Sequence, residues 1–508
     1  MRFPQLNRSE RSRAAFWGPW LLALALFLVY CADSISRYYR AAPGSYDLGI
    51  FTEAIKQYAH FHAPIVDILA PGFNLLGDHF HPIIAVIAPF FLIFPTPVTL
   101  LVAQAMLFAV AAVPIVWLGR DRIGEKSAYA VGVAYGLSFG VAQAVDFDFH
   151  EVAFAVPLLA FALWAMLEYR TRTLLVCCFL LLLCKEDIGL TFVLPIGIAV
   201  ILRGMPRLGG VIAGMGVAGS LIAIYWIIPQ FNSQHVYRYW DKNSCVGTTT
   251  GVAHGNAVSC LWDSGMASAG TKIELLFLLL ALTAFVALRS PLALLVVANL
   301  GLRFISTDTS FWGTTYHYNA VLMPVLFIAA IDAIARARWA DSNVVSLEES
   351  ALWSEIEGVP ELRPSPWWRR WADAVSRAMG QHGAVAMLAA GVAMVPQFAF
   401  DQFFNPGTFT FDARTSELRH AASLVPANVT VESTINVIAP LAAKDDVFWI
   451  GNTGNPAVQY VVLDTVVSGF AGTISDPVAF VEQRHPGVTY TVVWSDSYGI
   501  YVLERAGG

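Results

Sequence analysis

Long apolar runs dominate this chain and constrain its fold more than any other feature. Of its 508 residues 56% are hydrophobic and 13% are charged, whereas soluble domains carry about 25% charged residues. A spanning helix needs about 20 mostly apolar residues, and the chain has room for about eleven. We therefore expect a polytopic α-helical membrane protein whose spans cover residues 14–32, 97–118, 127–143, 152–168, 173–185, 188–202, 209–228, 272–288, 291–306, 318–335 and 383–400.

The apolar run 82–95 is short and ends at Pro95 and Pro97, so we place it as a re-entrant or interfacial helix that does not span. With this placement the basic loops all fall on the cytoplasmic side, as the positive-inside rule requires. The segments that sort this way carry Arg2, Arg8, Arg11, Arg13, Arg120, Arg122, Lys126, Arg170, Arg172, Arg203, Arg207, Arg289, Arg336, Arg338, Arg369 and Arg370. The basic N-terminus followed by a full-length apolar run is typical of an uncleaved signal anchor.

The chain divides into four parts on this topology. Residues 1–335 form a transmembrane module whose first outer loop is 33–96, and residues 336–382 form a cytoplasmic linker. Trp367, Trp368 and Trp371 in that linker suggest an amphipathic helix on the inner leaflet. After a last span at 383–400, residues 401–508 alternate short β-rich runs with helical candidates near 412–424 and 476–484, which predicts a small extracytoplasmic α/β domain.

Five polar clusters recur at what should be one face of the membrane. They are SYDLGIF (45–51), GDHFHP (77–82), DFDFHE (146–151), CKED (184–187) and TTYHYN (314–319). Charged groups near hydrocarbon are costly and persist mainly where they act. The clusters therefore indicate a single membrane-embedded active site that opens to the outside. With a net charge of −6, nothing in the chain is basic enough for nucleic acid.

The first two clusters supply a base and two imidazoles. Asp47 is either a helix cap or a general base that takes a proton from an attacking hydroxyl. Asp78 is followed by His79 and His81, whose side chains face the same way in an extended segment. The two histidines either bind a metal or donate hydrogen bonds to phosphate.

The third cluster is rich in carboxylates. Asp146, Asp148, His150 and Glu151 are helix-terminal caps, a pocket wall for acceptor hydroxyls, or, for the last three, ligands of a divalent cation.

The remaining clusters supply positive charge and hydrogen-bond donors. Lys185 either forms a structural salt bridge with Glu186 or Asp187 or faces a lipid-linked phosphate. Arg303 could also contact that phosphate. Tyr316 and His317 either hydrogen-bond a diphosphate or sugar or are ordinary interfacial side chains.

Two of the six cysteines lie in a polar loop that this topology places outside. Cys245 and Cys260 can therefore pair in an oxidising compartment, although their spacing alone does not establish a bridge.

The order SYDLGIF, GDHFHPI, DFDFHE, CKEDIGL and YHYNAVLMP resembles a bacterial family of predicted membrane proteins of unknown function, grouped with the GT-C superfamily of polytopic glycosyltransferases. The resemblance covers about residues 40–330, and LVPANVTVESTINVIAPLAAKDDVFWI is similar to the family's C-terminal pattern. It implies a plasma-membrane enzyme that takes a sugar from a polyprenyl phosphate or diphosphate on the outer leaflet and inverts the anomeric centre. Asp47 matches the base in the first outer loop. Many superfamily members carry a second acidic residue there, but Tyr46 and Leu48 flank Asp47, which leaves metal use open.

The leading hypothesis is an inverting hexosyl- or pentosyltransferase. An acceptor hydroxyl of a cell-envelope glycan, lipid or protein attacks the anomeric carbon, Asp47 takes the proton, and Lys185, Arg303 or His317 stabilises the leaving lipid phosphate. A transporter or flippase is the alternative, but it predicts inverted repeats with paired broken helices, and CKED has no counterpart in the other half. A non-catalytic scaffold would leave the clusters unexplained.

Overall fold

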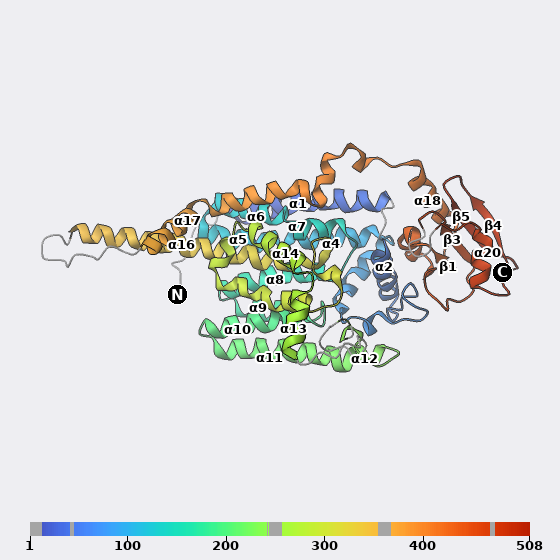
Figure 1. Ribbon diagram of the computed structural model, residues 1–508, viewed down its shortest axis with the longest axis horizontal. Helices are drawn as coiled ribbons and strands as arrows, with labels where there is room; N and C mark the ends of the chain where they lie inside the picture. Colours follow the sequence, from blue (N-terminus) through green and yellow to red (C-terminus); the bar gives the residue numbers. More distant parts are fainter. Residues whose placement is uncertain are drawn as a thin grey trace.

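Helices form the body of the molecule, and a five-stranded sheet lies at one end of it (Figure 1). The computed structural model describes residues 13–40, 45–240, 242, 257–353, 367–467 and 473–507. At the end opposite the sheet, helices α16 (Leu322–Trp353) and α17 (Trp367–Met394) extend beyond the other helices (Figure 1).

The other helices of the body follow the chain in order. They are α1 (Arg13–Tyr39), α2 (Tyr46–Ala59), α3 (Ala88–Ile93), α4 (Val98–Val110), α5 (Ala112–Ile123), α6 (Glu125–Gly136), α7 (Phe139–Asp146), α8 (Val152–Leu167), α9 (Thr171–Leu181), α10 (Leu194–Leu202), α11 (Pro206–Ile222), α12 (Ile228–Phe231), α13 (Ala257–Met266), α14 (Ala269–Leu282) and α15 (Val297–Phe304). Short 3-10 or π turns precede or join several of them, including η3 (Pro82–Ile87), η4 (Gly189–Val193), η8 (Pro291–Val296) and η10 (His317–Asn319).

Among the described residues, five helical segments are long and apolar enough to cross a membrane, or seven if each of two bent pairs is one span. The five are Phe16–Tyr39, Val98–Ile123, Pro206–Phe231, His317–Asp341 and Trp367–Gln397, and the bent pairs are Glu125–Gly136 with Phe139–Asp146 and Ser259–Met266 with Ala269–Leu282. Four shorter apolar helices, Val152–Leu167, Thr171–Leu181, Gly189–Leu202 and Pro291–Phe304, coincide with the remaining expected spans. The protein is thus a helical membrane protein, and eleven crossings stay a prediction.

Two element boundaries differ from the sequence-based expectation. The first span was expected to end at residue 32, but α1 continues to Tyr39, so Asp33 is fully buried within the helix and accepts a hydrogen bond from Gln402. The amphipathic helix expected in the linker is instead the first part of α17, continuous with the apolar part that follows. Gly380 lets α17 approach α16 closely enough for Arg338 Nε to donate to its carbonyl oxygen at 2.6 Å.

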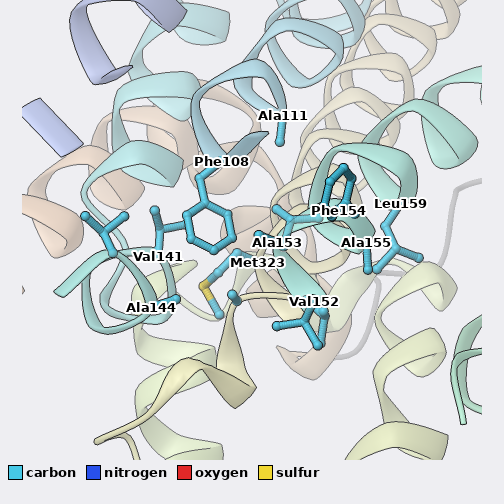
Figure 2. Packing of buried hydrophobic residues seen from close by; sticks show 14 of the residues in the cluster. Phe108, Ala111, Val141, Ala144, Val152, Ala153, Phe154, Ala155, Leu159 and Met323 are labelled. Carbon is cyan, nitrogen blue, oxygen red and sulfur yellow. The ribbon is translucent and has the colours of Figure 1, made fainter. Parts of the chain in front are cut away.

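A dense apolar core lies directly beneath the polar clusters. Phe108 of α4, Val141 and Ala144 of α7, Val152 of α8 and Met323 of α16 pack together in it (Figure 2). Gly140 is required for this packing, because a Cβ there would lie 2.8 Å from Met323 Cε and 2.9 Å from the Asn319 carbonyl oxygen. The core therefore fixes the ends of three helices that carry site residues.

The C-terminal domain contains β1 (Thr430–Ser433), β2 (Asp446–Trp449), β3 (Tyr460–Asp464), β4 (Tyr490–Ser495) and β5 (Ile500–Arg505), with α18 (Ala413–Leu424), α19 (Ile438–Ala442) and α20 (Pro477–Arg484). The strand order is β2-β1-β3-β5-β4. Strand β1 is parallel to β2 and β3, whereas β5 is antiparallel to β3 and β4. The α/β architecture expected from the alternating runs is what the structure has.

This domain packs against residues 46–59 of the loop after α1, through α2 and α19. Gly49 makes the contact possible, since a Cβ there would lie 2.2 Å from Ile438 Cγ2. The buried carboxylate of Glu53 accepts hydrogen bonds from Ile68 N–H at 3.3 Å and from Val447 N–H at 3.4 Å. Glu53 therefore joins α2, the rest of the first loop and strand β2.

Candidate functional site

Asp47 lies in the first turn of α2 and faces His150, the fifth residue of the third polar cluster (146–151). Asp47 Oδ2 is 3.5 Å from His150 Nε2, and the Asp47 side chain is 34% exposed. His150 Nδ1 is 3.1 Å from the Asp148 carbonyl oxygen. A carbonyl oxygen only accepts, so Nδ1 carries a proton, and Nε2 carries one in the imidazolium form.

The charge state of His150 follows from these contacts. Burial lowers the pKa of His150, but the hydrogen bond to Asp47 and the nearby carboxylates outweigh it and raise the pKa above its ordinary value. The imidazolium then donates Nε2–H to Asp47. This contact orients the carboxylate.

Asp148 holds the start of α2 in place. It is 1% exposed, and its Oδ1 accepts from Arg37 Nη1 at 3.2 Å while its Oδ2 accepts from Leu48 N–H at 3.2 Å. Burial raises the pKa of Asp148 to about 6, against the opposing effect of Arg37. Asp146 also contacts Arg37, with its Oδ1 3.7 Å from Nε, and accepts from Gln402 at 2.9 Å. Asp148 therefore positions α1 and α2, whereas Asp146 connects α1 to Gln402.

His150 also stacks on His317, which belongs to the fifth cluster and begins the apolar helical segment His317–Asp341. The two ring centroids are 3.6 Å apart with an angle of 22° between planes. Phe147 stacks on both imidazoles, and Tyr316 meets the edge of Phe147 at 5.2 Å. His317 is 4% exposed, and its Nδ1 has no hydrogen-bond partner among the described residues.

Lys185 from the fourth cluster pairs with Glu151, the residue after His150. Lys185 Nζ is 2.9 Å from Glu151 Oε1, and the side chains are 20% and 2% exposed respectively. Burial opposes the charge on both, but Lys185 holds the pKa of Glu151 well below its usual range. Glu151 in turn raises the pKa of Lys185 well above the usual value of a lysine. The site therefore presents a permanent cation next to the Asp47–His150 pair.

Glu186 ties the second cluster to the fourth. It accepts from His79 Nδ1 at 2.7 Å, from Phe80 N–H at 3.1 Å and from the Tyr237 hydroxyl at 2.9 Å. Burial opposes its ionisation, but His79 lowers the pKa of Glu186 to about 2. Burial by itself would lower the pKa of His79, but the neighbouring Glu186 carboxylate outweighs this effect and raises the pKa above its ordinary value. The pair is thus a charged hydrogen-bonded link.

Three further residues of these clusters lie around this link. Asp78 Oδ2 accepts from the Tyr239 hydroxyl at 3.3 Å. Burial raises the pKa of Asp187 to about 6, and its Oδ1 has no partner in the described part of the chain. His81 is 2% exposed, its ring is tilted against that of Phe51 with the centroids 5.7 Å apart, and its Nδ1 also has no described partner. Burial lowers the pKa of His81, so its imidazole is neutral at pH 7.

Arg303, one of the three residues expected to face the phosphate, uses most of its donors within the protein. Its guanidinium donates to the carbonyl oxygens of Phe311 and Tyr318 and to Asn319 Oδ1, at 2.7–3.3 Å. These contacts use four of its five N–H groups. Arg303 therefore holds the turn before His317, and we do not assign it to phosphate.

The described residues give no support to a metal centre. No group of three or more His, Cys, Asp or Glu side chains in the described ranges is arranged to hold an ion. Asp148, His150 and Glu151 are instead paired with Arg37, Asp47 and Lys185. We therefore assign no role to a divalent cation.

Only one cysteine of the expected Cys245–Cys260 bridge lies among the described residues. Cys260 is disulfide-bonded. Cys245 lies outside the described residues, so the pairing stays a prediction.

Sequence reasoning missed two residues that hold the site together. Gln104, 2% exposed in the middle of α4, donates to the Ala144 carbonyl oxygen and accepts from His150 N–H at 3.0 Å. A polar residue inside an apolar run is a signal that could have found it. Arg37 lies beyond the expected end of the first span, and its position on α1 gave no such signal.

Comparison with known proteins assigns the sequence to a family. The sequence matches the family model described as predicted membrane protein (DUF2079) over residues 37–479. The chain belongs to the DUF2079 family. A comparison with curated proteins finds no sequence match for this DUF2079 protein.

Two solved structures share the fold of the DUF2079 protein. ArnT from Cupriavidus metallidurans bound to undecaprenyl phosphate has a TM-score of 0.55 at 15% identity, covering 96% of this chain and 98% of that one. Its apo state has a TM-score of 0.52 at 15% identity, covering 97% and 98%. This likeness shows the fold alone: the protein is a helical membrane protein that shares the fold of ArnT over nearly its whole length.

Proposed function

We propose that this DUF2079 protein is an inverting glycosyltransferase that moves a sugar from a polyprenyl-phosphate donor to an acceptor outside the plasma membrane. The observation that carries the proposal is the Asp47–His150 pair beside the Lys185–Glu151 pair, at 3.5 and 2.9 Å. Because His150 and Glu151 are consecutive, they hold a candidate base and a cation in one region of the protein, and glycosyl transfer from a phosphate needs both. The shared fold with a protein solved with undecaprenyl phosphate supports the same class of donor.

Asp47 acts as the general base in this proposal. His150 holds Oδ2, and Oδ1 takes the proton of the acceptor hydroxyl as its oxygen bonds to the anomeric carbon. The bond between that carbon and the phosphate oxygen breaks, and its electron pair leaves with the lipid phosphate. Attack from the opposite face inverts the anomeric centre.

Lys185, His81 and His317 face the leaving phosphate. Lys185 supplies a positive charge, which stabilises the negative charge that develops on the leaving phosphate. The two Nδ1 atoms of His81 and His317 have no partner among the described residues and can hydrogen-bond phosphate oxygens. Because His81 is neutral without ligand, phosphate binding should be coupled to uptake of a proton there.

An exchange of one carboxylate tests the proposal. Asp47→Asn keeps the shape but removes the base, so we expect transfer from a polyprenyl-phosphate sugar to fall at least about 100-fold while donor binding survives. Asp67→Asn is the matched control, since Asp67 lies in the same loop and its Oδ1 accepts from Gly72 N–H, a bond that Asn preserves. Unchanged product formation by Asp47→Asn would remove the base and with it the proposed mechanism.

A further inference from the structure

A cavity of about 460 Å³ lies where the membrane part meets the C-terminal domain. Its walls come from the ends of α1 and α2 on one side and from α18 and the start of α19 on the other, and include Tyr38, Tyr39, Asp148, Ser423, Asn436 and Lys444. Asp47 and Lys185 are not among its lining residues. Its volume lies within the range of small-molecule sites, about 300–1,000 Å³.

Asn436 presents a buried acceptor at this cavity. The side chain is 6% exposed, and its Nδ2 donates to Asp464 Oδ2 at 2.8 Å. Arg414 pairs with the same carboxylate oxygen, which can only accept, so the orientation of the amide is fixed. Asn436 Oδ1 is buried without a partner among the described residues. Buried acceptors are normally satisfied, so this one points to a ligand that donates a hydrogen bond.

The hydroxyl groups of the wall also present acceptors. Ser34 donates to the Tyr30 carbonyl oxygen at 2.8 Å, Ser45 to Ile435 at 2.9 Å, and Ser423 to His420 at 2.7 Å. Each hydroxyl proton is spent within the protein, and each oxygen keeps lone pairs for a donor. The cavity therefore suits a ligand that carries several hydroxyl groups.

The charges of the wall argue against an ionic ligand. Arg37 pairs with the carboxylates of Asp148 and Asp146, and Lys444 Nζ donates to the carbonyl oxygens of Ala422 and Val425. Arg419 lies 4.6 Å from the centre of the Tyr39 ring. Two of the three cations are thus already neutralised or saturated, which disfavours an anion, while all three repel a cation.

We propose that this cavity binds an uncharged carbohydrate, with its hydroxyl groups on Asn436 and the serines and its C–H face on Tyr38 and Tyr39. The assignment does not depend on the proposed transfer reaction. Asp148 connects the two sites, because it lines the cavity and also accepts from Leu48 N–H, next to Asp47. Occupancy of the cavity is thereby linked to the position of α2.

Saturation-transfer NMR on the full-length protein in lipid nanodiscs tests the assignment. The probes are maltotriose, cellotriose, mannotriose and chitotriose, with inorganic phosphate as the charged comparison. Ser423→Phe fills the cavity, and Asn436→Leu removes the acceptor. Ser416→Phe is the control, since Ser416 lies on the same helix, is exposed and does not line the cavity.

We expect at least one trisaccharide to bind the wild-type protein and Ser416→Phe equally. Ser423→Phe should bind it at least about tenfold more weakly, and Asn436→Leu about five- to tenfold more weakly. Ser423→Phe keeps the Asn436–Asp464 bond, so it decides the matter if Asn436→Leu does not fold. Failure of all four saccharides to bind, binding unchanged in Ser423→Phe, or stronger binding of phosphate than of any saccharide would each overturn the proposal.

Discussion

The imidazole rings of His150 and His317 stack with their centroids 3.6 Å apart, although 166 residues separate them in the chain. At this separation two positive charges would repel strongly, so one ring of the pair must stay neutral when the other is charged. His150 is the one that contacts Asp47. His317 is thereby left to face a ligand through its Nδ1, which lacks a described partner.

His317→Phe separates the two functions of that ring. Phenylalanine keeps an aromatic face against His150 and Phe147 but has no Nδ1, so packing should survive while one contact to the donor phosphate is lost. We expect KM for the polyprenyl-phosphate sugar to rise about tenfold with little change in kcat, the effect of one hydrogen bond to a charged group. Steady-state kinetics of transfer will show this. An equal loss in kcat with KM unchanged would place His317 elsewhere in the reaction.

Lys185 should act mainly on donor binding. Lys185→Ala removes a charge that meets the phosphate both in the bound donor and in the transition state, and it leaves Glu151 buried and unpaired. We expect donor affinity to fall about 10- to 100-fold. Lys185→Arg keeps the charge and should recover much of this affinity. If Lys185→Arg is as defective as Lys185→Ala, charge is not what the residue contributes.

The sequence predicted which segments meet, but not how they pair. The five polar clusters were expected on one face because charges near hydrocarbon need a reason to be there. The structure joins four of them through His79–Glu186, His150–Asp47 and Lys185–Glu151 and the fifth through the stacking of His317 on His150. Such pairings depend on distances between segments far apart in the chain, which no local pattern encodes.

Local patterns also mislead where the same residue types fit two different structural roles. The apolar stretch ends near residue 32, but α1 continues to Tyr39, where Asp33 Oδ1 accepts from Gln402 and Arg37 donates to Asp148. Arg303 fitted a phosphate site by its type and position, yet its donors close a turn. The strands of the C-terminal domain were predictable because the local preference of alternating β-branched runs for strands agrees with the secondary structure of the folded domain.

Reporter fusions will test the orientation of the chain. The basic loops predict that residues 336–382 are cytoplasmic and that the C-terminal domain is outside. A reporter placed within 336–382 and one placed after Gly508 should therefore report opposite sides. The same side for both would contradict the topology and the outward-facing site together.

Glu53 should make the docking of the C-terminal domain depend on pH. Burial raises the pKa of Glu53 from its usual 4.5 to about 8, against the opposing effect of Lys56. The docked state therefore binds the proton more tightly than the undocked state. Its stability should be greatest below about pH 4.5 and should fall as pH rises towards 8, by at most about 1.4 kcal/mol per pH unit.

Hydrogen exchange at the contact provides the measurement. Val447 N–H donates to Glu53, so peptides containing residues 446–449 should exchange faster relative to a matched intrinsic rate as pH rises from 5 to 8. Glu53→Gln cannot ionise and should flatten this dependence above about pH 6. Below that, Asp445, whose pKa burial raises to about 6, still titrates at the same contact. A slope between pH 6 and 8 that is the same in Glu53→Gln and the wild type would show that another group controls docking.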